Sequence, residues 1–248
     1  MDFFDVVIFS AIMGLSIYGS YPIVLKKDLK EILSKALIAV AVGIMIFLLA
    51  DVFSDASQIL YNGSLYGYGS SPLQDAIFSL SLIAGFFMLY IVENRSKSGL
   101  TKHRLSFLIA LGIGLQNLTE GLVFGSLAVE IGLAGIALVV LIGFIIQNIT
   151  EGFPIGSPFI GNTEGKGFFV LVMFLVGGIP TILGGAIGFY YNSRTFDLIF
   201  DGLAIGAIFY IIFPMLKGLL SSMTLNSKRV IYAGLFLGFM VGFLVNLI

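Results

Sequence analysis

Residues 105–154 read LSFLIALGIGLQNLTEGLVFGSLAVEIGLAGIALVVLIGFIIQNITEGFP. The segment holds two apolar runs, at about 105–127 and 131–154, and each is long enough to cross a bilayer as a helix. Only a short turn near Glu130 separates the runs, so two antiparallel neighbouring helices are predicted. A polar hexapeptide interrupts each run: Gln116-Asn117-Leu118-Thr119-Glu120-Gly121 and Gln147-Asn148-Ile149-Thr150-Glu151-Gly152. Amides and carboxylates are unfavourable in hydrocarbon, so both hexapeptides are predicted to be functional.

The composition of the whole chain extends this prediction to a membrane protein. Hydrophobic residues make up 58%, charged residues 11%, and the mean hydropathy is +1.06. Soluble domains have about 45–50% apolar and about 25% charged residues. We therefore expect an all-α integral membrane protein with eight transmembrane helices in a single domain, 1–248. The predicted spans are about 3–24, 33–54, 72–92, 105–127, 131–154, 167–191, 196–219 and 229–248.

Basic residues orient these spans. Twelve of the 13 Lys and Arg residues lie in alternate connections, and only Arg194 lies on the other side. The positive-inside rule then places those connections in the cytoplasm and both termini outside. The first run carries Asp2 and Asp5 instead of a basic leader, so we expect it to remain as a helix and not to be cleaved. We expect a multi-pass protein of the cell membrane, either the plasma membrane or an inner membrane.

The similarity between the two copies continues beyond the hexapeptides. Gly112 precedes Gln116 by four residues as Gly143 precedes Gln147, and Gly-Ser follows both copies at the same offset. A spacing of 31 residues equals one helix and a tight turn, which places the copies at a similar depth on antiparallel helices. This arrangement is typical of the inverted-repeat elements that hold midplane sites in secondary transporters.

Glycines spaced four residues apart accompany the copies and recur in the later spans. Small residues at this spacing let membrane helices approach backbone to backbone. We therefore predict close helix contacts at four pairs: Gly121 and Gly125, Gly152 and Gly156, Gly184 and Gly188, and Gly202 and Gly206.

Helix geometry within each copy predicts the chemistry of the site. Positions four apart share a face, so Gln116 lies one turn from Glu120, and Gln147 one turn from Glu151. If the two faces oppose, two carboxylates and several amide oxygens converge. A divalent cation would neutralise both carboxylates and accept the amide oxygens. Without a cation, one or both glutamates would have to take up a proton or separate.

The paired motifs resemble those of the ZIP family of divalent-metal transporters. In that family, the fourth and fifth of eight helices carry His-Asn-x-x-Glu-Gly and a close relative of it, and both termini face away from the cytosol. The resemblance covers the whole chain in topology and the two motif helices closely. It implies that the primary metal ligands are Gln116, Glu120, Gln147 and Glu151, with Asn117 and Asn148 near an adjoining position.

This chain departs from the family pattern in its donor atoms. Glutamine opens both motifs where the family most often has histidine, and the only histidine, His103, is expected in a cytoplasmic loop. Ile179 stands where many relatives place a glutamate in the sixth helix, so a second metal site is left open. Ligands that are all oxygens suit Mn²⁺, Mg²⁺ or Fe²⁺ better than Zn²⁺, although zinc also stays open.

Acidic residues outside the motifs predict an outer vestibule that attracts cations. Asp51 and Asp55 are one turn apart at the outer end of the second span, and Asp201 lies about one turn into the seventh. Asp51 and Asp201 are assigned to the pathway, whereas Asp55 and Asp75 are expected to be solvated interfacial acids.

Together these features predict secondary or facilitative transport of a divalent cation toward the cytoplasm. A Na⁺- or H⁺-coupled carrier of another solute, using the same acids, is the alternative. No enzymatic activity is expected, because the spans lack the His or Lys partners that a membrane hydrolase uses. We expect no cofactor beyond the transported ion and no nucleic-acid partner. The lipid bilayer is expected to surround the chain, and a homodimer is one option.

Overall fold

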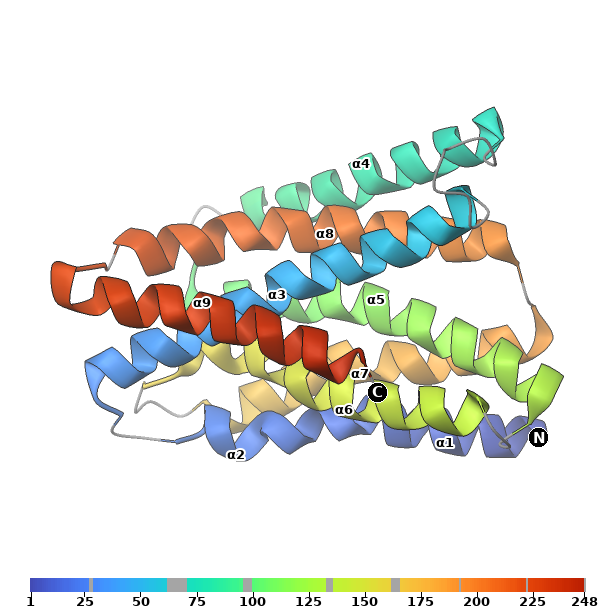
Figure 1. Cartoon of the computed structure of the whole chain (residues 1–248), viewed down its shortest axis with the longest axis horizontal. Coiled ribbons are helices and arrows are strands. Elements are labelled where there is room, and N and C mark those ends of the chain that lie inside the picture. Colours follow the sequence, from blue (N-terminus) through green and yellow to red (C-terminus); the bar gives the residue numbers. More distant parts are fainter. Residues whose placement is uncertain are drawn as a thin grey trace.

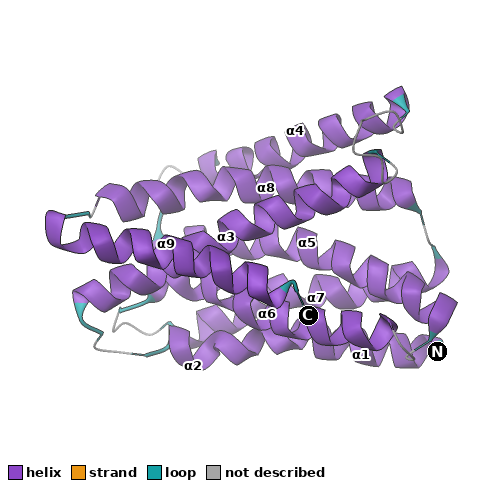
Figure 2. Ribbon diagram, in the orientation of Figure 1, coloured by secondary structure: helices purple, strands orange, loops and turns teal. Residues whose placement is uncertain are grey.

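The structure of the chain is a computed structural model in which every described element is helical (Figures 1 and 2). The described residues are 1–26, 29–61, 71–95, 100–132, 136–161, 166–191, 193–221 and 223–247. Eight segments within them are long and apolar enough to cross a membrane, as the sequence predicts. The elements are α1 (Phe3–Leu15), η1 (Ser16–Ser20), α2 (Tyr21–Val24), α3 (Glu31–Leu60), α4 (Pro72–Asn94), α5 (Lys102–Ile131), α6 (Ile136–Gly156), η2 (Ser157–Phe159), α7 (Gly167–Tyr190), α8 (Arg194–Ser221) and α9 (Leu225–Val245).

The first span is built from three helical pieces in succession. Asp2 caps α1 by accepting a hydrogen bond from the Asp5 backbone, and the Asp5 carboxylate bonds back to the Asp2 backbone in a capping box. The chain then tightens into the 3₁₀ helix η1 before α2 completes the crossing. Figure 1 shows α1 and α2 lying roughly end to end along the bundle.

Several helix boundaries differ by a few residues from the sequence prediction, among them the end of α3 and the start of α5. α3 continues to Leu60, six residues beyond the predicted end at 54. α5 begins at Lys102, so the expectation that His103 lies in a loop is wrong. Thr101 caps this helix through the Arg104 backbone, which adds a first turn that hydropathy does not detect. The His103 ring packs edge-on against Phe169 at a centroid distance of 4.6 Å and against Phe159 at 5.0 Å.

Successive spans run in opposite directions, which gives the bundle two distinct ends (Figure 1). The basic end, defined here by the start of α3, the start of α5 and the end of α8, holds every described Lys and Arg except Arg194. The opposite end holds the end of α3, the end of α5 and the start of α8. The charge asymmetry seen in the sequence is therefore an asymmetry between the two ends of the molecule.

Glycines allow the closest helix pairs. A Cβ atom at Gly184 in α7 would overlap the Leu118 carbonyl oxygen of α5, and one at Gly206 in α8 would overlap the Leu82 carbonyl oxygen of α4. These contacts are backbone to backbone, the approach that small residues permit in membrane helices. At all four predicted glycine pairs an added Cβ would collide with a neighbouring helix, which confirms the predicted close contacts.

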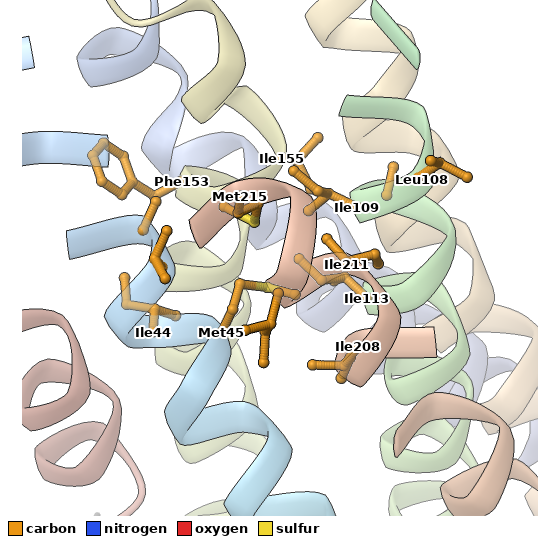
Figure 3. Close-up of a cluster of buried hydrophobic side chains, with 14 of the residues drawn as sticks. Ile44, Met45, Leu108, Ile109, Ile113, Phe153, Ile155, Ile208, Ile211 and Met215 are labelled. Atoms are coloured by element: carbon orange, nitrogen blue, oxygen red, sulfur yellow. The ribbon is translucent and has the colours of Figure 1, made fainter. Parts of the chain in front are cut away.

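The largest buried apolar cluster fills the basic half of the bundle. Figure 3 shows side chains from α3, α5, α6 and α8 in this cluster: Ile44, Met45, Leu108, Ile109, Ile113, Phe153, Ile155, Ile208, Ile211 and Met215. On α5 and α6, these residues lie on the basic side of the two hexapeptides. A closely packed apolar layer therefore separates the hexapeptides from the basic end.

Candidate cation site

All six predicted site residues are buried, three on α5 and three on α6. Glu151 is fully buried and Glu120 is 6% exposed. The glycine that follows each glutamate brings its helix against a neighbour. A Cβ at Gly121 would overlap the Thr181 carbonyl oxygen of α7, and one at Gly152 would overlap the Ile17 carbonyl oxygen of η1. Each hexapeptide thus combines its acid with a backbone contact that fixes the depth and rotation of the helix.

Four of these side chains form a closed hydrogen-bonded ring, which we call the amide–carboxylate ring (Gln116, Glu120, Gln147 and Glu151). Gln116 Nε2 donates to Glu120 Oε1 at 2.9 Å and to Glu151 Oε1 at 3.1 Å. Gln147 Nε2 donates to Glu120 Oε1 at 2.7 Å and to Glu151 Oε1 at 3.2 Å. Each glutamine therefore bridges both glutamates, one within its own helix and one across to the neighbouring helix.

The two asparagines differ in their contacts. Asn148 Nδ2 donates to the Phe144 carbonyl oxygen at 3.0 Å and to Glu120 Oε2 at 3.4 Å, so Asn148 borders the ring. Asn117 Nδ2 instead donates to the Gly177 carbonyl oxygen of α7 at 2.9 Å. Asn117 thereby ties α5 to α7 and also lies beside the Glu151 carboxylate, so both asparagines border the ring while their backbone partners differ.

Several oxygens of the site are buried without a hydrogen-bond partner among the described residues. They are Gln116 Oε1, Asn117 Oδ1, Asn148 Oδ1 and Glu151 Oε2. Buried polar atoms in proteins nearly always have a hydrogen-bond partner. A group of buried acceptor oxygens without a donor therefore indicates a bound partner that carries positive charge or protons. Because all four are oxygens of carboxylate or amide groups, the donor set fits a hard cation.

The site contains fewer acids than many metal centres. Within the described residues, no group of three or more His, Cys, Asp or Glu side chains is arranged to hold a metal ion. A cation at the ring would therefore be held by two carboxylates and neutral amide oxygens. Two carboxylates balance the charge of one divalent ion, and the amides would complete its coordination.

A cavity of about 370 Å³ leads to the ring from the opposite end of the bundle. Gln116, Glu120 and Gln147 lie at its deep end, and its wall carries no Lys, Arg or His among the described residues. The apolar layer of Figure 3 closes the other side of the ring. The remaining lining residues are Asp51, Val52, Asp55, Gln58, Ile59, Thr119, Val123, Val140, Phe144, Asp197, Asp201 and Asn246.

The structure places both predicted pathway acids on this wall. Asp51 Oδ1 accepts a hydrogen bond of 2.5 Å from Asn246 Nδ2 near the end of α9. Asp201 is only 2% exposed and lies about two turns into α8, because the helix begins earlier than predicted. Asp55, expected to be a solvated interfacial acid, also lines the cavity.

Asp197 is a cavity residue that the sequence analysis did not select. It precedes Asp201 by one helical turn, so the spacing of four residues was the available signal. The surplus of aspartates over basic residues at this end gives the cavity a negative potential, which attracts cations from solution.

Neither a scan of the sequence against protein-family models nor a search of curated proteins finds a match.

Proposed function

We propose that this protein is a transporter that moves a divalent metal cation across the cell membrane toward the cytoplasm. One observation carries the proposal: an acidic cavity that leads in from one end of the bundle is lined by Glu120, which shares the ring with the buried Glu151. A carrier that works by alternating access needs such an arrangement, with a central site exposed to one side at a time.

The charge of the site favours a cation over an organic anion as cargo. Glu120 and Glu151 are surrounded by apolar helices, where two like charges are unfavourable unless they are neutralised. A divalent ion bound between them removes this repulsion. An anionic solute would need a basic partner, and the described cavity wall offers none.

The donor atoms favour a hard ion. Carboxylate and amide oxygens suit Mn²⁺, Mg²⁺ and Fe²⁺, whereas Zn²⁺ prefers imidazole and thiolate. The resemblance of the paired motifs to the ZIP family supports the same class of cargo. We therefore rank Mn²⁺-like ions first and keep zinc as a candidate.

Charge asymmetry supports the direction of transport. Cytoplasmic connections are enriched in Lys and Arg, which assigns the basic end to the cytoplasm and the cavity to the outside. Both termini then lie outside, and α5 and α6 act as inverted-repeat elements. For the cation to leave inward, the apolar layer near Ile113 and Ile155 must separate while the cavity closes.

Uptake of a panel of divalent ions into proteoliposomes tests the proposal. We expect saturable uptake by the native chain and its loss in Glu120→Gln/Glu151→Gln, which removes both charges with little change in volume. Glu31→Gln is the matched control, because its carboxylate pairs with Lys35 at the basic end, far from the ring. Uptake of no divalent ion, or unchanged uptake in the double variant, would overturn the proposal. Solute uptake driven by Na⁺ or H⁺ alone would then favour the alternative carrier.

A further inference from the structure

The cavity wall carries a second group of carboxylates besides those of the ring. Asp51 and Asp55 come from α3, and Asp197 and Asp201 come from α8. Acids at the mouth of a cavity are commonly solvated and by themselves indicate no binding site. Asp201 differs from the other three, because it is almost completely enclosed.

Asp201 is a buried carboxylate with an unsatisfied oxygen. Its side chain is 2% exposed, and Asp201 Oδ1 has no hydrogen-bond partner among the described residues. Leaving such an oxygen without a partner is strongly unfavourable, so a buried carboxylate is normally paired or coordinates a cation. The space next to Asp201 is the cavity, which offers a polar volume in which that partner can bind.

Local packing holds Asp201 in this position. The next residue, Gly202, lies against α4, where an added Cβ would come within 2.8 Å of Ser81 Cβ. Leu198, three residues earlier, is fully buried against α3 and α4 side chains of a second apolar cluster. With Gly202 and Leu198 packed on neighbouring helices, the Asp201 side chain is left on the cavity wall.

Asp201 and Glu120 both lie well inside the outer ends of their helices, α8 and α5. Asp201 is seven residues from the start of α8, or about 10 Å at about 1.5 Å per residue. Glu120 is eleven residues from the end of α5, or about 16 Å. Thr119, the residue before Glu120, hydrogen-bonds to the Asp201 side chain, which places Asp201 next to the ring.

We propose that Asp201 is the centre of a second cation site, which binds a hydrated divalent cation in the cavity. Asp201 provides a direct carboxylate ligand through Oδ1, Thr119 hydrogen-bonds to the same side chain, and Asp197 and Asp55 contact the water shell. This arrangement agrees with the lack of a described three-acid cluster, since ions such as Mg²⁺ keep several waters and use only one or two carboxylates. Five waters, which complete an octahedral shell with Asp201, occupy roughly 150 Å³ at about 30 Å³ each. The cavity of about 370 Å³ accommodates them.

The site deepens the proposed function and rests on it only for the role of the bound ion as cargo. An ion bound at Asp201 is close to the ring and is no longer fully surrounded by bulk water. The ring carboxylates then compete for it over a short distance. We therefore expect Asp201 to raise the apparent affinity of transport and not its maximal rate.

Direct Mn²⁺ binding, measured as loss of the free-ion paramagnetic resonance signal, tests the site in purified full-length protein. The native chain should bind one more Mn²⁺ than Glu120→Gln/Glu151→Gln. Adding Asp201→Asn to that double variant should remove the remaining ion. Asp75→Asn, at the same end but outside this cavity, should leave the ion bound when added to the double variant.

The possible outcomes distinguish failure of the Asp201 site from failure of the transport proposal. If the double variant binds no Mn²⁺, or if Asp201→Asn behaves like Asp75→Asn, the Asp201 site is overturned, and uptake by the native chain still decides the transport proposal. If the double variant binds an ion that Asp201→Asn removes but the native chain transports nothing, the site stands and the transport proposal fails. In uptake assays, Asp201→Asn alone should raise the half-saturating Mn²⁺ concentration several-fold. An unchanged half-saturation would count against the site.

Discussion

At the scale of single residues, the glutamines are the distinctive part of the site. Each presents its amide nitrogen to both glutamates, so Glu120 Oε1 and Glu151 Oε1 each accept two hydrogen bonds. Hydrogen bonds to charged groups are stronger than neutral ones, and leaving a buried partner unsatisfied is unfavourable. The amides therefore stabilise a pair of buried acids and also carry oxygens that can bind a cation.

Removal of one amide should destabilise the fold. Gln147→Leu leaves both glutamates with one donor fewer, and we expect the free energy of unfolding to fall by about 1–3 kcal/mol. Gln58→Leu is the control, because Gln58 is exposed at the cavity wall and should change stability little. Reversible unfolding in detergent measures both. Equal stability of the two variants would show that the ring amides do not support the glutamates.

The same positions should govern ion selectivity. Gln116→His replaces an amide oxygen with an imidazole nitrogen, a ligand that Zn²⁺ favours. We expect the ratio of Zn²⁺ to Mn²⁺ uptake to rise about tenfold or more, since ~1.4 kcal/mol of differential binding corresponds to that factor. Competition between the two ions in proteoliposomes provides the ratio. A ratio unchanged from the native chain would remove Gln116 from the coordination shell.

At the scale of helices, glycine contacts decide how the ring is assembled. Gly184 packs on the α5 backbone at Leu118, two residues before Glu120. Gly112 and Gly143 occupy the same offset in the two copies, yet an added Cβ at Gly112 would meet Ile211, whereas Gly143 faces open space. The two copies of the repeat therefore share their polar residues, but the helices that pack around each copy differ.

Alanine substitutions should separate these environments. Gly184→Ala forces α5 and α7 apart, and we expect it to lower the free energy of unfolding by about 1–3 kcal/mol and to reduce uptake. Gly143→Ala should change both properties little, because nothing lies within 4 Å of its added Cβ. Thermal unfolding and Mn²⁺ uptake of the two variants provide the comparison. A Gly184→Ala protein as stable as Gly143→Ala would argue against a tight α5–α7 contact.

At the scale of the whole molecule, the cavity and the apolar layer make the two ends unequal. The ring is reached from the end that holds Asp55 and Asp197, and a layer of isoleucine and methionine side chains blocks the other end (Figure 3). In the transporter that we propose, alternating access would require this layer to open in a second conformation.

Cysteine labelling should test this orientation, and the chain contains no native cysteine to interfere. In intact cells, a membrane-impermeant thiol reagent should label Gln58→Cys on the cavity wall. Lys102→Cys at the basic end should react only after permeabilisation, because we propose that this end faces the cytoplasm. The buried Met215→Cys should react slowly in both conditions. Labelling of Lys102→Cys from outside would reverse the proposed topology.

The eight spans can be predicted from the sequence alone, as can the position of the two polar hexapeptides within them. Both are local properties of the sequence. A span requires about 20 apolar residues, and amide or acidic residues inside such an apolar run are easily recognised. The sequence did not show which helix faces meet, because core-facing and lipid-facing side chains are equally apolar in a membrane protein. The tertiary structure was needed to show that Asn117 donates to the α7 backbone while Asn148 donates to its own helix and to Glu120, and that Asp201 lies buried beside the cavity. These features depend on how α3, α5, α6 and α8 pack around a common space, which no single segment encodes.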